Sequence, residues 1–236
     1  MKSILSLLQF TTILPLGKPQ DLEYFARHTY IYPLAGYVIG GLVGGLAYFI
    51  ANQTLAAAVV IALLFLITGA HHFDGLLDFG DGLMAHGDTE KRIRALTDRN
   101  IGAGAIAIGI ATTLLLFTGL QESTSILCAI IIGEVCAKFS MSFLTVYGTP
   151  FHEGMHSYLH QFAKPFFPVL SFLLCLPLFL LPIAPIKIFT ALILMLVCPL
   201  ILLIISGRIF GGVNGDVAGA SNEITRALVI VGITLL

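Results

Sequence analysis

Residues 55–83 read LAAAVVIALLFLITGAHHFDGLLDFGDGL, an apolar run that ends in a cluster of acids. Residues 55–70 carry no charged side chain, and an apolar helix of that kind is typical of a membrane span. Three aspartates then follow within eight residues, in a chain of which only 11% is charged. The stretch therefore predicts a helix that crosses a membrane and places carboxylates at one membrane face.

The composition of the whole chain also indicates a membrane protein. Of its 236 residues, 57% are hydrophobic and 24 are glycine, and the mean hydropathy is +0.97. A soluble domain of this size could not bury so much apolar surface. We therefore expect an all-α, polytopic membrane bundle in a single domain, residues 1–236, with about seven transmembrane helices and its motif loops on the cytoplasmic face. The apolar stretches are 31–50, 55–70, 101–120, 125–147, 165–184, 186–206 and 223–236. The last is short, and the sequence leaves open whether it spans fully.

The basic residues predict the orientation of these spans. Ten fall on one side of the predicted membrane, Lys187 falls on the other, and Lys138 lies within a span. By the positive-inside rule the first side is cytoplasmic. Polar chemistry gathered at one face favours an enzyme acting on a cytosolic substrate, and the net charge of −1 offers no basic surface for nucleic acid. The ten residues are Lys2, Lys18, Arg27, Lys91, Arg92, Arg94, Arg99, Lys164, Arg208 and Arg226.

The aspartate cluster is the strongest candidate for chemistry. On a helix, Asp74, Asp78 and Asp81 fall within about 60° of one another on one face. Carboxylates about 5 Å apart would repel by roughly 3 kcal/mol per pair at an effective dielectric of 20, so this face favours a divalent cation or bound protons. Oxygen ligands alone favour Mg²⁺, with Mn²⁺ possible, over zinc. The alternative is a solvated acidic loop.

Two histidines stand beside the aspartates, and either could act as a general base. An ideal helix would put His71 on the carboxylate face and His72 on the other. Because glycines at 75, 80 and 82 make an ideal helix an unsafe assumption, the spacing does not decide between them.

A second polar stretch, TDRNIGAGA at 97–105, fits a phosphate site. Asp98 and Arg99 precede a predicted helix start, where Gly102 and Gly104 would permit close backbone approach and the helix dipole favours anions. Glycines are also common where membrane helices pack, so this pattern alone is weak.

Charged residues within or between later spans add further candidates. Glu134 and Lys138 are four residues apart and can pair along a helix, and Lys138 could reach a substrate phosphate. The segment FHEGMHSYLH at 151–160 fits a loop over the active site better than a zinc site, because its spacing is not His-Glu-x-x-His. In RIFGGVNGDVAGASNE at 208–223, the glycines around Asp216 favour a ligand loop over a plain turn.

These motifs together resemble the cobalamin synthase family, the adenosylcobinamide-GDP ribazoletransferases. The resemblance covers nearly the whole chain and is carried by four ordered motifs. They are LQFTTILPL at 8–16 with YPLAG at 32–36, HFDGLLDFGDG at 72–82, Asp98 with IGAGA at 101–105, and GGVNGDVAGA at 211–220. Two departures stand out. The family's Lys-Asp-Ser-Arg reads Thr97–Asn100 here, and an arginine common in the N-terminal motif is Ile13.

The resemblance implies a reaction and a set of partners. The substrates would be adenosylcobinamide-GDP and α-ribazole or its 5′-phosphate, with GMP released and adenosylcobalamin or its phosphate formed in the presence of Mg²⁺. Phosphoryl transfer mainly needs positioning and charge neutralisation. Asp74, Asp78 and Asp81 would hold the metal, Asp98 or Asp216 could complete the shell, and His72 would be the base. A multi-pass protein of the plasma (inner) membrane would then hold this site facing the cytoplasm.

Two other readings are weighed against this one. A CDP-alcohol phosphotransferase also uses aspartates at a membrane face, but its motif has Ala-Arg where this chain has Asp78-Phe79. A metal-ion carrier would need further ionisable groups within several spans, and the sequence places only Glu134 and Lys138 there. The lower base, the number of metal ions and the oligomeric state cannot be derived from the sequence.

Overall fold

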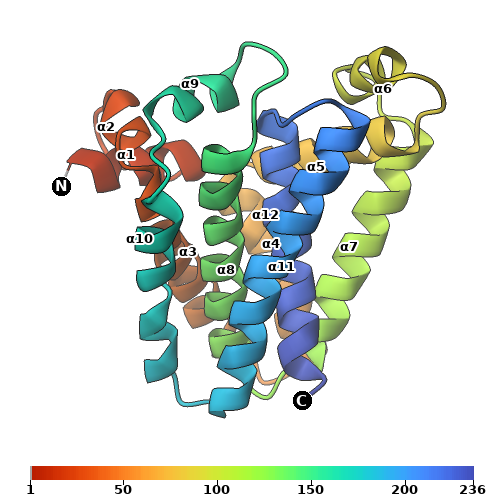
Figure 1. The fold of residues 1–236 in the computed structure, drawn as a ribbon. Helices are drawn as coiled ribbons and strands as arrows, with labels where there is room; N and C mark the ends of the chain where they lie inside the picture. The colour runs from red at the N-terminus through yellow and green to blue at the C-terminus, as the bar shows by residue number, and fades with distance from the viewer. Residues whose placement is uncertain (1) are drawn as a thin grey trace.

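A computed structural model describes residues 2–236, which fold into a helical bundle (Figure 1). The long bundle helices are α3 (Tyr32–Ala47), α4 (Gln53–Thr68), α7 (Ala103–Gln121), α8 (Ile126–Tyr147), α11 (Pro185–Ile209) and α12 (Gly215–Thr234). A seventh, broken element combines α10 (Phe167–Leu173) and the 3₁₀ helix η2 (Leu176–Leu180). Within the described chain the only β pairing is an isolated bridge between Pro150 and Val213, so the all-α prediction is confirmed.

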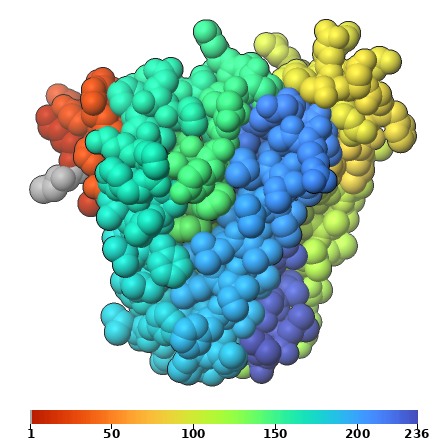
Figure 2. Space-filling view, in the orientation of Figure 1, coloured from red at the N-terminus to blue at the C-terminus, as the bar shows by residue number. Residues whose placement is uncertain are grey.

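The remaining helices gather at one end of the bundle. They are α1 (Lys2–Thr11), α2 (Glu23–Ala26), η1 (Thr29–Ile31), α5 (His71–Met84), α6 (Thr89–Leu96) and α9 (Met155–Phe162). The connections that follow α3, α7 and η2 lie at the opposite end, together with the C-terminus (Figure 1). The N-terminal helices and α6 project on opposite sides of the first end (Figure 2). We call this first end the polar end.

Length and apolarity identify four helices that could cross a membrane: residues Thr29–Ala47, α7, α8 and α11. Two sharply bent pairs, α4 with α5 and α9 with α10–η2, raise the number to six if each pair is one span. The protein is therefore a multi-pass membrane protein, and the predicted total of seven crossings stays a prediction. The C-terminal helix begins at Gly215, eight residues before the apolar stretch that the sequence suggested.

The bundle is organised around α8, whose side chains are nearly all buried. Along α3, glycines at 36, 40 and 44 allow its backbone to lie directly against α8. A methyl group added at Gly36 would come within 2.6 Å of the Val135 Cα atom. This spacing of small residues is a common way for membrane helices to pack closely. On its other side α8 packs against α12, and α12 in turn packs against α5, so the core connects directly to the aspartate helix.

Candidate active site

The chain turns sharply between the membrane helix α4 and the aspartate helix α5, whose axes differ by 97°. Gly69 and Ala70 both adopt left-handed backbone conformations, with φ of 64° and 57°. Glycine adopts this conformation at little cost, whereas alanine does so only under strain of about 1 kcal/mol or more. As a result α5 lies across the polar end of the bundle rather than continuing through the membrane (Figure 1).

The three predicted aspartates lie on α5, but they have different surroundings. Asp74 is exposed in the first turn, where a carboxylate complements the positive end of the helix dipole. Asp78 is half-buried one turn later. Asp81 accepts hydrogen bonds from the backbone N–H groups of Gly102 at 2.7 Å and Ala105 at 2.8 Å. Asp81 therefore caps the N-terminus of α7 through the tertiary fold.

This contact changes the interpretation of the predicted phosphate site. The helix start does bind an anion, as the sequence suggested, but in this structure that anion is the carboxylate of Asp81. A Cβ atom at Gly102 would lie 2.5 Å from Asp81 Oδ1, so the glycine makes room for the cap. A Cβ at Gly104 would lie 2.5 Å from the Gly80 carbonyl oxygen. The close crossing of α5 and α7 therefore accounts for a glycine at position 104. Phosphate binding by Gly102 and Gly104 stays a prediction.

Asp216 lies far away in sequence but directly beside α5. Its segment is not the predicted loop, because α12 begins at Gly215 and Asp216 occupies the first helical turn. Asn214 caps this helix by accepting from the Val217 N–H at 3.0 Å, and its Nδ2 donates to Asp216 Oδ2 at 2.7 Å. A Cβ atom at Gly75 would lie 2.9 Å from Asp216 Cα, so the two helices touch at these residues.

Burial and neighbouring charges both disfavour the ionised form of Asp78. Burial, followed by the charges of Asp216, Asp74 and Asp81, raises the pKa of Asp78 to about 7. Burial also raises the pKa of Asp216, while the hydrogen bond from Asn214 lowers it. The protein thus concentrates negative charge between α5 and the start of α12, where a cation would be favoured.

The fold separates the two adjacent histidines. His71 is exposed beside the turn at Gly69. His72 is only 7% exposed, and its Nδ1 atom has no hydrogen-bond partner among the described residues. Burial, followed by the positive charges of Lys138 and Arg226, lowers the pKa of the His72 imidazole, which favours the neutral form. A neutral imidazole is the form that a base requires, although the burial of His72 limits its access to a substrate.

Asp98 and Arg99 lie in the exposed segment between α6 and α7. Asp98 accepts hydrogen bonds from the backbone N–H of Asn100 at 3.1 Å and from its side chain at 2.8 Å. This arrangement is a local turn, and these bonds do not connect Asp98 to the α5 carboxylates. Their predicted contacts with substrate stay predictions.

Lys138 lies fully buried inside the bundle, where protein groups satisfy its charge. Its Nζ donates to Asn222 Oδ1 at 2.6 Å and lies 3.5 Å from Glu134 Oε2, so the predicted pairing with Glu134 is confirmed. Arg226 binds Glu134 at 2.7 Å and also Glu223. The expectation that only Glu134 and Lys138 are charged within the bundle is therefore wrong. Counting Arg226 among the ten basic residues on one side of the membrane is also wrong, because it lies buried inside the bundle on a helix that begins at Gly215.

The sequence reasoning missed Glu223, Asn222 and Asn214. The first two could have been found from the helical spacing i, i+3 and i, i+4 that places Asn222 and Glu223 near Arg226. Asn214 has a clear local signal, since an Asn-Gly-Asp sequence before an apolar run is typical of a helix start. The pairing of α12 with α8 has no such signal in the sequence, because its hydrogen bonds join residues that are 84 and 92 positions apart.

Within residues 2–236 no group of three histidine, cysteine, aspartate or glutamate side chains converges closely enough to form a ready metal centre. Asp81 is bonded to α7, which leaves Asp74, Asp78 and Asp216 as the described carboxylates around the crossing of α5 and α12 without such a bond to a neighbouring helix. Their mutual repulsion and oxygen-only chemistry fit Mg²⁺ better than a soft metal. A metal held by Asp74, Asp78 and Asp81 stays a prediction.

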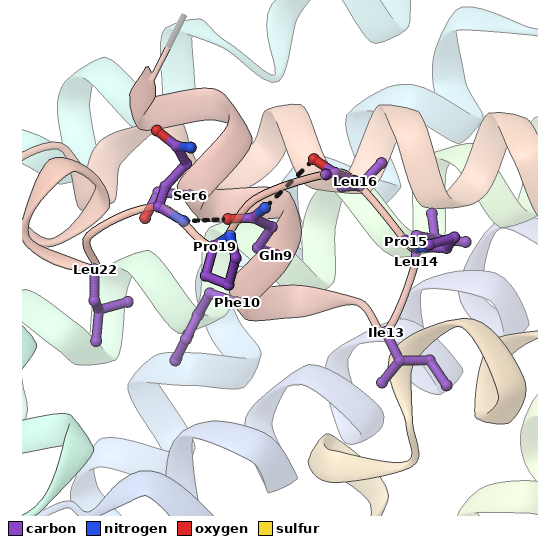
Figure 3. A pocket seen from close by; sticks show the side chains of 11 residues that line it. Ser6, Gln9, Phe10, Ile13, Leu14, Pro15, Leu16, Pro19 and Leu22 are labelled. Atoms are coloured by element: carbon purple, nitrogen blue, oxygen red, sulfur yellow. Dashed lines mark hydrogen bonds between the residues drawn. The ribbon is translucent and has the colours of Figure 1, made fainter.

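A pocket of about 430 Å³ lies in the N-terminal region (Figure 3). It is lined by α1 and the segment that follows, including Phe10, Ile13 and Pro15 from the N-terminal motif. The Ile13 N–H donates to the Ile67 carbonyl at 2.8 Å, which ties this wall to the end of α4. The Gln9 side chain is committed to the segment itself, since it bonds Leu16, Lys18 and Gln20.

Comparison with known proteins identifies the family. Residues 3–234 match the family model described as cobalamin-5-phosphate synthase. A relative from Methanocella arvoryzae is 35% identical over 96% of this chain and 93% of its own length, and one from Archaeoglobus fulgidus is 34% identical over 100% and 98%. A third, from Methanococcoides burtonii, is 31% identical over 96% and 89%. All three are named adenosylcobinamide-GDP ribazoletransferase, and no solved structure matches the chain. The carboxylates that meet between α5 and α12 thus belong to a member of the cobalamin-5-phosphate synthase family.

Proposed function

We propose that this protein joins adenosylcobinamide-GDP to α-ribazole or its 5′-phosphate and releases GMP, which is the last stage of cobalamin assembly. The observation that carries the proposal is the contact of α5, at Gly75, with the backbone of Asp216 at the polar end, in a chain that belongs to this family. The hydroxyl of the ribazole attacks the phosphorus on the cobinamide side of the diphosphate. The new P–O bond forms as the bond to GMP breaks, and the hydroxyl proton leaves to a base.

Carboxylates from α5 and the start of α12 would hold Mg²⁺, with Mn²⁺ as an alternative. When bound, such an ion neutralises charge on the diphosphate and on the leaving phosphate. We assign Asp74 and Asp78 to the metal, and Asp216 to the metal or substrate shell. The raised pKa of Asp78 supports this assignment, because burial and then the charges of Asp216, Asp74 and Asp81 disfavour its ionised form, and a bound cation would relieve both effects.

The remaining predicted residues have positioning or contact roles in this proposal. Asp81 fixes α7 against α5 and can reach the metal only if its bonds to the α7 amides are shared or broken. His72 accepts the hydroxyl proton if the substrate reaches its buried ring. Asp98 and Arg99 lie on the exposed segment where a nucleotide could contact them, while Lys138 supports α12 from inside the bundle.

We also propose that the protein lies in the plasma membrane with its polar end in the cytoplasm. Nine basic residues lie at or near the polar end once Arg226 is removed from the count, and Lys187 lies at the other end. This asymmetry supports the positive-inside assignment. It would place the carboxylates at the cytoplasmic face, where they could act on a cytosolic substrate.

The test is an assay in proteoliposomes with adenosylcobinamide-GDP, α-ribazole and Mg²⁺, in which GMP release is followed. We expect release only when both substrates and the metal are present. Release of CMP from a CDP-alcohol, or transport of Mg²⁺ without turnover, would support one of the other two functions. Failure of the wild-type protein to release GMP from any combination would contradict the proposal.

A further inference from the structure

The segment Thr149–Gly154, between α8 and α9, takes no part in the site as described so far. Its backbone is fixed to the turn that precedes Asp216. The Val213 N–H donates to the Thr149 carbonyl at 2.9 Å, and Pro150 and Val213 form a parallel bridge. Because the two segments run parallel from this bridge, the residues that follow Pro150 lie alongside the residues that follow Val213. His152 is thereby carried toward Gly215 and Asp216.

Aromatic packing fixes the same segment to the aspartate helix. The Phe151 ring lies 6.4 Å from the ring of Phe210, which lies 5.9 Å from the ring of Phe79 on α5. Phe79 and Phe210 are both buried. Since Phe79 directly follows Asp78 in the chain, these three rings connect the 149–154 segment to the carboxylate site.

The imidazole of His152 packs against Phe151, the first of these three rings, and is exposed to solvent. Its ring stacks edge-on against Phe151 with centroids 4.8 Å apart. Nδ1 lies 2.7 Å from the Glu153 carbonyl oxygen and therefore donates its hydrogen to it. Nε2 is the nitrogen left for another partner, and it can donate to an oxygen when the ring is the imidazolium. His152 therefore lies on a segment that is fixed beside the turn leading into Asp216.

We propose that His152 contacts the diphosphate of the nucleotide-linked substrate, forming the third side of a site whose other sides are α5 and the start of α12. This inference rests on the proposed function, because it assigns a ligand group to that same site. A diphosphate bound by the carboxylates through a cation would still present oxygens on its outer side. An imidazolium fixed on that side can donate from Nε2 to one of these oxygens, which is a charge-assisted hydrogen bond.

The test compares three variants by GMP release in proteoliposomes, with each substrate varied in turn. His152→Ala should raise the KM for adenosylcobinamide-GDP about tenfold, the effect of losing one hydrogen bond to a charged group, and leave the KM for α-ribazole unchanged. His152→Arg keeps a phosphate-binding side chain and should stay within about threefold of wild type. His86→Ala removes another exposed histidine at the polar end and should match wild type.

The outcomes separate this inference from the proposed function. If wild type releases GMP and His152→Ala behaves as His86→Ala does, the contact is absent. A KM increase confined to α-ribazole, or an equal loss in His152→Arg and His152→Ala, also overturns it. If wild type releases no GMP at all, the failure is that of the proposed function.

Discussion

At the scale of single residues, the three aspartates of α5 look alike in the sequence but should behave differently when changed. Asp78→Asn removes a charge that is crowded by Asp216 and Asp74, so folding should not suffer. If Asp78 holds the metal, turnover should fall by at least ~100-fold, which corresponds to about 3 kcal/mol of lost charge stabilisation. GMP release at saturating Mg²⁺ and the melting temperature in detergent measure the two effects.

Asp81→Asn is the matched comparison. An amide can accept from only one of the two α7 N–H groups that the carboxylate now satisfies, so this variant should lose about 1–2 kcal/mol of stability. A melting temperature unchanged from wild type would remove the capping role of Asp81. Near-normal turnover in Asp78→Asn would remove Asp78 from the metal site.

At the scale of helices, the site depends on one close crossing. Gly75 lies against the backbone of Asp216, so the methyl group of Gly75→Ala would meet main-chain atoms that cannot rotate away. We expect α12 to shift relative to α5 and turnover to fall by at least about tenfold, because small displacements of catalytic groups are costly. The protein should still fold, since the rest of the bundle is unaffected.

The control for this crossing is Gly41→Ala on α3. A methyl group there meets no atom within 4 Å, and alanine favours a helix more than glycine does. This variant should match wild type in GMP release. Equal activity in the Gly75 and Gly41 variants would show that the contact between α5 and α12 does not position the site.

The buried charges between α8 and α12 permit a second test at this scale. Arg226→Met would leave Glu134 and Glu223 without their shared partner in a low-dielectric interior, at a cost of about 3–5 kcal/mol. The double change Glu134→Leu with Arg226→Met removes one charge of each sign and keeps Lys138 near Glu223. It should recover most of the lost melting temperature. No recovery would mean that packing of the arginine stem, rather than charge balance, holds the two helices together.

These helices also show which features the sequence could predict. The spans of α7, α8 and α11 were predictable because long apolar runs are set by local composition. The turn at Gly69 and Ala70 was not, because it occurs inside a stretch that remains compatible with one continuous helix. The role of Asp81 was hidden for a related reason, since its partners are 21 and 24 residues away and a helical wheel reports only neighbours on the same helix.

At the scale of the whole molecule, the orientation in the membrane can be tested by labelling introduced cysteines in intact cells. The four native cysteines are buried and should give little background with a membrane-impermeant maleimide. The position Ser221, which the sequence would suggest as a cytoplasmic probe, is fully buried in α12 and would be silent on either side. His86, exposed just after α5, is the better probe of the polar end.

Cysteines placed singly at Ala51 and Thr124 should label from outside, because both positions are exposed at the end opposite the aspartates (Figure 1). His86→Cys should label only after the cells are permeabilised. The physical reason is the asymmetry of basic residues, nine near the polar end against Lys187 at the other, since positive segments are retained in the cytoplasm. Labelling of His86→Cys in intact cells, with protection at Ala51 and Thr124, would reverse the orientation. Asp78, Asp216 and His152 would then face away from the nucleotide-linked substrate, so the proposed reaction depends on the first pattern.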